Sequence, residues 1–214
     1  IIAHELFHHW FGDLVTCESW SNLPLNESFA NYSQFLWDDF EHGRMEADMN
    51  AYGEMEGYFM SAQQGGHVDM IRFDYKSKED MFDGHSYNKG GRILNMLRAY
   101  VGDDAFFASL NLYLTENAHK NAEIHDLRLA FEETTGEDLN WFFNQWFLSS
   151  GHPVLKYEQK YNTETKKLTV SITQKQNTEK WPLYKLPINI DIYVDGKPRR
   201  EMVWVENVEN TFEF

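Results

Sequence analysis

The sequence predicts an α+β fold, with a helical region over residues 1–150 and a region of β-strands over residues 151–214. Apolar residues recur at helical spacing in the first region, whereas they alternate with polar residues in the second. The charge changes at the same place, because residues 1–150 carry 25 acidic and 9 basic side chains while residues 151–214 carry 9 and 10. Two domains are therefore expected, and the second has too few strands to be complete.

A helix predicted to open at residue 1 carries the pattern His-Glu-x-x-His, formed by His4, Glu5 and His8. Residues four apart lie on one face of a helix, so His4 and His8 can reach one metal ion. Glu5 is turned by about 100° from His4, which suits a general base acting on a water that the metal activates. The pattern therefore predicts a hydrolytic zinc site.

A third ligand must come from another element, and Glu27 follows His8 by nineteen positions, in the first turn of a second helix predicted over residues 25–43. Two histidines and one carboxylate leave the fourth position of zinc open for water. The alternative is an amphipathic core helix whose histidines are satisfied by hydrogen bonds, because His-Glu-x-x-His also arises by chance. The downstream glutamate favours the metal site.

Further helices are expected in the first region and strands in the second. The helices are predicted over residues 44–62, after Gly91, over 105–118 and over 139–148, with Asp103 or Asp104 and then Asp138 as N-caps of the last two. Apolar and polar residues alternate over residues 168–173 and 186–194, and the second run ends in an Asp-Gly turn. These runs predict half-buried antiparallel strands.

Four segments resemble the aminopeptidase N family of zinc metallopeptidases: HELFHHWFGDLVT (4–16), WSNLPLNESFA (20–30), YNKGG (87–91) and GHPVL (151–155). The resemblance implies a thermolysin-like helical catalytic subdomain followed by the start of an antiparallel β-sandwich. It implies one Zn²⁺ bound by His4, His8 and Glu27, with Glu5 as the general base. It also implies that Tyr87 donates a hydrogen bond to the oxyanion that forms during peptide hydrolysis, where a neutral phenol stabilises developing charge.

The sequence departs from the family pattern at several positions near the predicted ligands. Asn22, Pro24 and Ser28 replace the residues that the family usually has there, and His9 stands where Gln is common. None of these changes removes a ligand. His9 points about 100° away from His8 and is expected to line the pocket or form a hydrogen bond. Asn31, one turn after Glu27, can orient a zinc-bound histidine.

The resemblance implies a peptidase acting on peptides, and more narrowly an aminopeptidase that removes N-terminal residues. The segment with which the family holds the free amino terminus lies upstream of the zinc helix, so the chain is expected to be a fragment that lacks the N-terminal part of its parent and can be inactive alone. Two alternatives stay open. One is a non-catalytic, peptidase-like binding or scaffold protein, and the other is a zinc endopeptidase.

Composition limits the other classes of function. With 42% hydrophobic and 16% aromatic residues, the chain can bury a substantial core and reads as globular. A net charge of −15 argues against nucleic acid and anionic membranes as partners, because no basic patch is present to neutralise phosphates. No transmembrane segment is expected. The single cysteine, Cys17, excludes an internal disulfide and leaves the compartment open.

Overall fold

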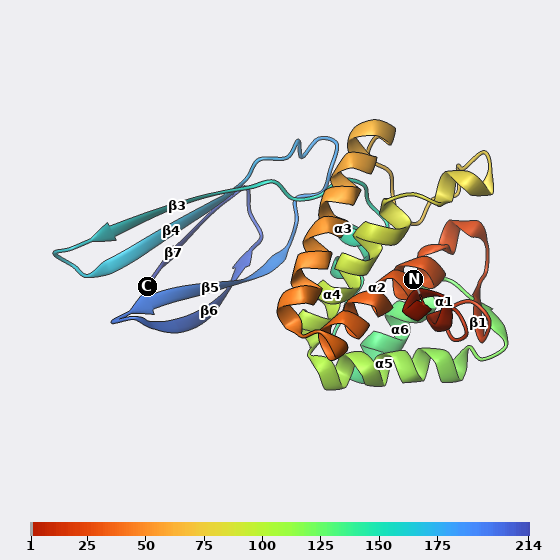
Figure 1. Ribbon diagram of the computed structural model, residues 1–214. Helices are drawn as coiled ribbons and strands as arrows, with labels where there is room; N and C mark the ends of the chain where they lie inside the picture. The colour runs from red at the N-terminus through yellow and green to blue at the C-terminus, as the bar shows by residue number, and fades with distance from the viewer. Residues whose placement is uncertain (1) are drawn as a thin grey trace. The chain divides into compact units, whose positions relative to one another are not determined.

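The computed structural model describes residues 2–214 and contains two compact units, which divide between Ser150 and Gly151. The first unit is helical and the second consists of antiparallel strands (Figure 1). The elements of the first unit are α1 (Ile2–Phe7), β1 (Val15–Cys17), η1 (Trp20–Asn22), α2 (Pro24–Glu41), α3 (Arg44–Gly65), η2 (Lys78–Met81), η3 (His85–Lys89), α4 (Gly90–Val101), α5 (Asp103–Glu116), β2 (Lys120–Ala122), α6 (Ile124–Thr135) and α7 (Asn140–Trp146).

Helix α1 is shorter than the sequence predicts, because it ends at Phe7 and His8 lies in the turn that follows. The predicted start at residue 1 lies outside the described residues. The amide of Asp13 donates to the carbonyl of His8 at 2.8 Å, which folds the chain back after the helix. This reversal of the chain requires a glycine at position 12. Its φ is 151°, and a Cβ there would lie 2.8 Å from the carbonyl oxygen of His8.

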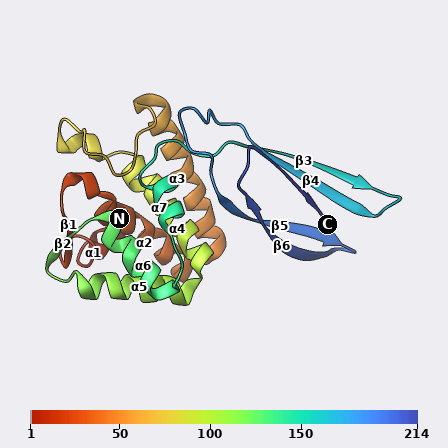
Figure 2. The same cartoon turned by 180° about the vertical axis from the view of Figure 1, so that it is seen from behind.

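Helix α2 lies at the centre of the first unit and packs against α1, α3, α4 and η3. Most of its residues from Pro24 to Phe35 are buried, because neighbours cover it on several sides. The rings of Phe29 in α2 and Phe11 stack with centroids 4.1 Å apart, which fixes the turn after α1 on α2. Figure 2 shows the same unit from behind, with α5 and α6 side by side at its base. Strands β1 and β2 form a short parallel pair.

The predicted helices over residues 25–43, 44–62, 105–118 and 139–148 are confirmed as α2, α3, α5 and α7. The helix expected after Gly91 is found as α4, which begins one residue earlier, at Gly90. The predicted cap of α5 is wrong. Gly102 precedes that helix, and Asp103 instead receives two hydrogen bonds of 2.8 Å from the guanidinium of Arg98. The predicted cap of α7 is wrong too, because Leu139 holds the N-cap position; Asp138, one residue earlier, accepts a hydrogen bond of 2.9 Å from the amide of Asn140.

The second unit contains a three-stranded and a two-stranded sheet, both antiparallel. The first has the order β3 (Leu155–Asn162), β4 (Lys167–Gln174), β7 (Glu209–Glu213), and the second pairs β5 (Leu186–Val194) with β6 (Lys197–Val205). The two predicted strands are confirmed as β4 and β5, and Val170, Ile172, Leu186 and Ile192 are buried. Among residues 2–214 no helix is both long and apolar enough to cross a bilayer.

Candidate metal centre

Two histidines and one glutamate converge between α1 and α2. The Nε2 atoms of His4 and His8 lie 3.3 Å and 3.4 Å from the same oxygen of Glu27, Oε2. One ligand atom from each of the three residues falls within 4.8 Å of the others. His4 comes from α1, His8 from the turn after it and Glu27 from the first turn of α2, so the packing of α2 against α1 assembles the cluster.

The donor set fits a divalent cation. Glu27 is only 8% exposed, and its Oε2 atom is buried without a hydrogen-bond partner among the described residues. A buried carboxylate oxygen without a partner is costly unless a cation compensates it. Nδ1 of His8 lies 3.1 Å from the carbonyl oxygen of Phe11, and a proton on Nδ1 leaves the lone pair of Nε2 facing Glu27.

The electrostatics of His4 also suit a ligand. Burial lowers the pKa of His4 and outweighs the negative charge of Glu27, which acts in the opposite direction, while His8 lowers it further. The imidazole is therefore neutral near pH 7, and a neutral imidazole is the form that binds a metal.

The side chain next to Nδ1 of His4 is that of Gln34, whereas the sequence predicts Asn31 as the residue that orients a histidine ligand. Asn31 donates to Glu54 at 2.9 Å, and Glu54 in turn pairs with Arg92 at 3.0 Å. The side-chain amide of Gln34 instead lies 3.5 Å from Nδ1 of His4 and 3.4 Å from the side-chain oxygen of Asn31. Asn31 thus contacts Gln34, and Gln34 lies next to His4. The role of Gln34 could have been predicted from the sequence, because Gln34 follows Glu27 by seven residues, which is two turns along one face of α2.

The sequence also singles out Tyr87, and the structure brings it to the cluster. The rings of Tyr87 and His4 are nearly parallel, with an interplanar angle of 5° and centroids 6.0 Å apart. Burial raises the pKa of Tyr87, and the adjacent carboxylate of Glu27 raises it further. The phenol therefore keeps its proton at neutral pH and can donate a hydrogen bond.

Glu5 in α1 and His9 in the turn after it are both exposed. Glu5 lies beside His4 on α1, and its negative charge is close enough to raise the pKa values of His4 and Tyr87. His9 lies 3.6 Å from Asp13, and both side chains are mostly exposed. His9 therefore takes no part in the cluster.

Two departures from the family pattern have structural partners. The side-chain oxygen of Asn22 accepts a hydrogen bond of 2.9 Å from the buried amide of Ile124, at the start of α6. The hydroxyl of Ser28 donates to the carbonyl oxygen of Ser86 at 2.7 Å, which joins α2 to η3. Both residues stabilise the surroundings of the cluster.

A helical unit that brings together a histidine from one helix, a histidine from the turn after it and a glutamate from the next long helix has the arrangement of a metallopeptidase zinc site. Residues 1–146 match the family model described as the Peptidase family M1 domain. The chain therefore belongs to peptidase family M1.

Relatives in sequence agree with this family, and a solved structure has the same fold. The chain is 34% identical over 193 residues to Tricorn protease-interacting factor F2 from Thermoplasma volcanium, covering 85% of this chain and 24% of that protein. It is 37% identical over 162 residues to Aminopeptidase N from Streptomyces lividans, covering 73% and 19%. The chain thus spans a quarter or less of these relatives. The structure of Legionella pneumophila aminopeptidase A in complex with aspartic acid superposes with a TM-score of 0.81 at 23% identity, over 100% of this chain and 24% of that chain, and shows the same fold.

Proposed function

We propose that the protein of which this chain forms part is a zinc-dependent aminopeptidase that removes N-terminal residues from peptides. The observation that carries this proposal is the convergence of His4, His8 and Glu27 around one buried carboxylate oxygen without a hydrogen-bond partner. In this proposal, residues 1–150 are the helical part of the catalytic domain and residues 151–214 are part of a β-strand domain.

His4, His8 and Glu27 would hold one zinc ion. Zinc supplies a Lewis acid that makes water nucleophilic near pH 7 and polarises a carbonyl group. Glu5 takes a proton from the attacking water and later gives it to the leaving amine. Tyr87, protonated and beside His4, donates a hydrogen bond to the oxygen that becomes negatively charged, which stabilises the transition state more than the ground state.

The altered residues near the ligands do not count against an enzyme. The altered residues Asn22 and Ser28 form hydrogen bonds that join neighbouring elements, so they are compatible with an intact site. The restriction to an aminopeptidase draws on relatives that bear this name. A zinc endopeptidase would use the same three ligands.

Zinc content tests the metal site directly. Elemental analysis of the purified protein is expected to give about one zinc per chain in the wild type, and much less in His4→Ala and Glu27→Ala. His9→Ala is the matched control, because His9 is exposed outside the cluster, and it should retain the metal. Equal zinc in all four proteins would overturn the proposed ligands.

Hydrolysis of aminoacyl and N-blocked peptide substrates by the intact protein tests the reaction. Glu5→Gln is expected to abolish turnover while zinc stays bound, because the amide cannot accept the proton. Cleavage restricted to substrates with a free amino terminus supports the aminopeptidase, whereas cleavage of blocked peptides would indicate an endopeptidase. A wild-type protein that binds zinc without any turnover would indicate a scaffold.

A further inference from the structure

Tyr87 lies in an unusual backbone conformation. It is the middle residue of η3, a single π-helical turn over His85–Lys89, in which the amide of Lys89 donates to the carbonyl of Gly84 at 2.9 Å. Fewer than about 1% of residues in globular proteins are in π-helices, and single π-helical turns occur frequently at functional sites. Because a π-turn is less stable than an α-helical turn, neighbouring groups must hold it in place.

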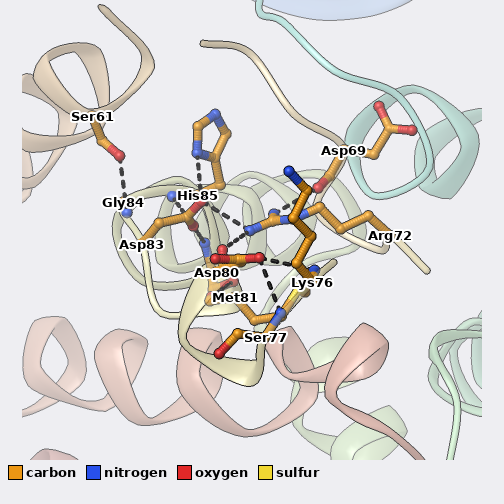
Figure 3. Close-up of polar contacts among 11 residues, drawn as sticks. Ser61, Asp69, Arg72, Lys76, Ser77, Asp80, Met81, Asp83, Gly84 and His85 are labelled. Carbon is orange, nitrogen blue, oxygen red and sulfur yellow. Dashed lines mark hydrogen bonds and ion pairs between the residues drawn. The ribbon is translucent and has the colours of Figure 1, made fainter. Parts of the chain in front are cut away.

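The carboxylate of Asp83 binds several hydrogen-bond donors at the start of this turn (Figure 3). Its Oδ1 atom accepts hydrogen bonds from the backbone amides of His85 at 2.9 Å and Ser86 at 3.0 Å. Its Oδ2 atom lies 3.0 Å from the guanidinium of Arg72 and 3.2 Å from Nδ1 of His85. Asp83 thus caps η3 and at the same time fixes it to the loop before η2.

Arg72 is itself held in a fixed place. Its side chain is 9% exposed, and it donates to the carbonyl oxygens of Asp69, at 2.9 Å, and Asp80, as Figure 3 shows. Burial would raise the pKa of Asp83, but the hydrogen bonds from His85 and Ser86 and the charge of Arg72 outweigh it and lower the pKa. The carboxylate therefore remains ionised at neutral pH, and its ion pair with Arg72 is maintained.

The other side of η3 is fixed to the helix that carries Glu27. The carbonyl oxygen of Ser86 accepts from Ser28, the residue after Glu27, at 2.7 Å. The hydroxyl of Ser86 donates to the carbonyl of Met81 at 2.6 Å, and the amide of Gly84 donates to Ser61 of α3 at 3.2 Å. The backbone of η3 is therefore held against α2 and α3, while Asp83 fixes the amides at its start.

We propose that Asp83, anchored by Arg72, is a positioning residue for Tyr87: it holds the π-turn so that the phenol faces the His4–His8–Glu27 cluster. This inference rests on the proposed function, because Asp83 matters for catalysis only if Tyr87 donates a hydrogen bond to the oxyanion. A donor acts fully only when it is already in place where charge develops, and a displacement of about 1 Å can reduce the rate by about 100-fold.

The test uses Asp83→Asn in the intact protein, with Asp80→Asn as the matched control. Asn keeps an oxygen that can cap η3 but loses the ion pair with Arg72. Asp80 caps the neighbouring turn η2, where its carboxylate accepts from the amides of Lys76 and Ser77, and η2 does not carry Tyr87. We expect kcat to fall by about 10- to 100-fold in Asp83→Asn, with KM and zinc content unchanged, and to stay within about twofold in Asp80→Asn.

A double-mutant cycle separates positioning from a general structural effect. In the Tyr87→Phe background, Asp83→Asn should reduce kcat little further, because the group that it positions is absent. The same reduction in both backgrounds would overturn the proposal. Arg72→Gln provides a second variant that leaves the cap intact, and its kcat should also fall in the wild-type background only. An inactive wild type, or active Glu5→Gln, would instead refute the proposed function.

Discussion

At the scale of single residues, Lys89 is an unusual ionisable group because it is a buried lysine outside the metal centre. Its side chain is 4% exposed at the end of η3, and its ammonium lies 5.6 Å from the centroid of the Tyr58 ring. Burial lowers its pKa to about 8, although the charges of Asp69 and Asp83 act to raise it. Such a lysine makes the stability of the fold depend on pH in the alkaline range.

The pH dependence can be measured by comparing the wild type with Lys89→Met. Between pH 8 and the ordinary lysine pKa of about 10.5, the unfolded chain binds a proton that the folded chain does not, so this group's contribution to stability rises with pH. We expect the free energy of unfolding of the wild type to rise by about 2 kcal/mol relative to Lys89→Met between about pH 8 and about pH 10. Urea denaturation at both pH values measures the difference. A constant difference would show that Lys89 has an ordinary pKa in the folded protein.

At the scale of elements, the close approach of α4 to α2 depends on Gly90. A Cβ at this position would lie 1.8 Å from the hydroxyl oxygen and 2.5 Å from the Cβ of Ser28, inside the buried region next to Glu27. Any larger residue must therefore push the two helices apart or break the hydrogen bond of Ser28 to η3.

We expect Gly90→Ala to destabilise the protein by about 1–3 kcal/mol, as overpacked cores generally do. Gly53→Ala is the matched control in the interior of α3, because a Cβ at Gly53 meets nothing within 4 Å, and it should stabilise the helix by up to about 1 kcal/mol. Urea midpoints of the two variants and the wild type provide the measurement. Equal effects of the two substitutions would contradict the close contact.

The long elements could be predicted from the sequence, because their apolar residues repeat along a buried face. Helix α6 was not predicted, although Ile124, Leu127 and Phe131 follow helical spacing. Its N-cap position holds Glu123, outside the residue types that usually mark a helix start. Strands β1 and β2 are three residues long and carry no periodicity, and they pair only because the fold brings them together.

The candidate site was predictable for a different reason. His4, Glu5, His8 and Glu27 lie in a short local pattern whose spacing carries the geometry, and Tyr87 was implied by a motif. Gln34 could have been found from its helical spacing after Glu27, whereas Asp83 and Arg72 could not, because their contacts form in irregular segments where no periodicity marks a face. Asn31 is an example of what spacing cannot predict. Helical spacing places it on the same face of α2 as Glu27, but it does not show that its side chain binds Glu54 of α3.

At the scale of the whole molecule, charge is distributed unevenly along the chain. Residues 1–150 hold 25 acidic and 9 basic side chains, a net charge of −16, whereas residues 151–214 carry +1, which together give the −15 of the chain. Like charges on one compact unit repel one another and reduce its stability. Dissolved salt screens this repulsion, because the Debye length falls to about 8 Å at physiological ionic strength.

We therefore expect added NaCl to stabilise the protein. Raising its concentration from about 0.01 M to about 0.15 M should increase the free energy of unfolding in urea by roughly 1 kcal/mol. The variant Asp104→Asn/Glu133→Gln removes two exposed carboxylates from the helical unit and should respond less. A salt response equal to that of the wild type would show that repulsion between these charges does not limit stability.

Strand β3 lies at one edge of the three-stranded sheet, and all eight of its residues are exposed. Within residues 2–214 no strand pairs with its outer edge, which therefore offers backbone donors and acceptors to an extended chain. Tyr157 and Tyr161 on one face are 71% and 59% exposed. Edge strands of this kind start intermolecular sheet growth unless charged side chains prevent it. Lys156 and Lys160 stand on the opposite face, and Lys156 forms an ion pair with Glu158 between them at 2.7 Å. We therefore expect these lysines to limit aggregation, and replacing both with apolar residues to make the edge a template for fibril formation.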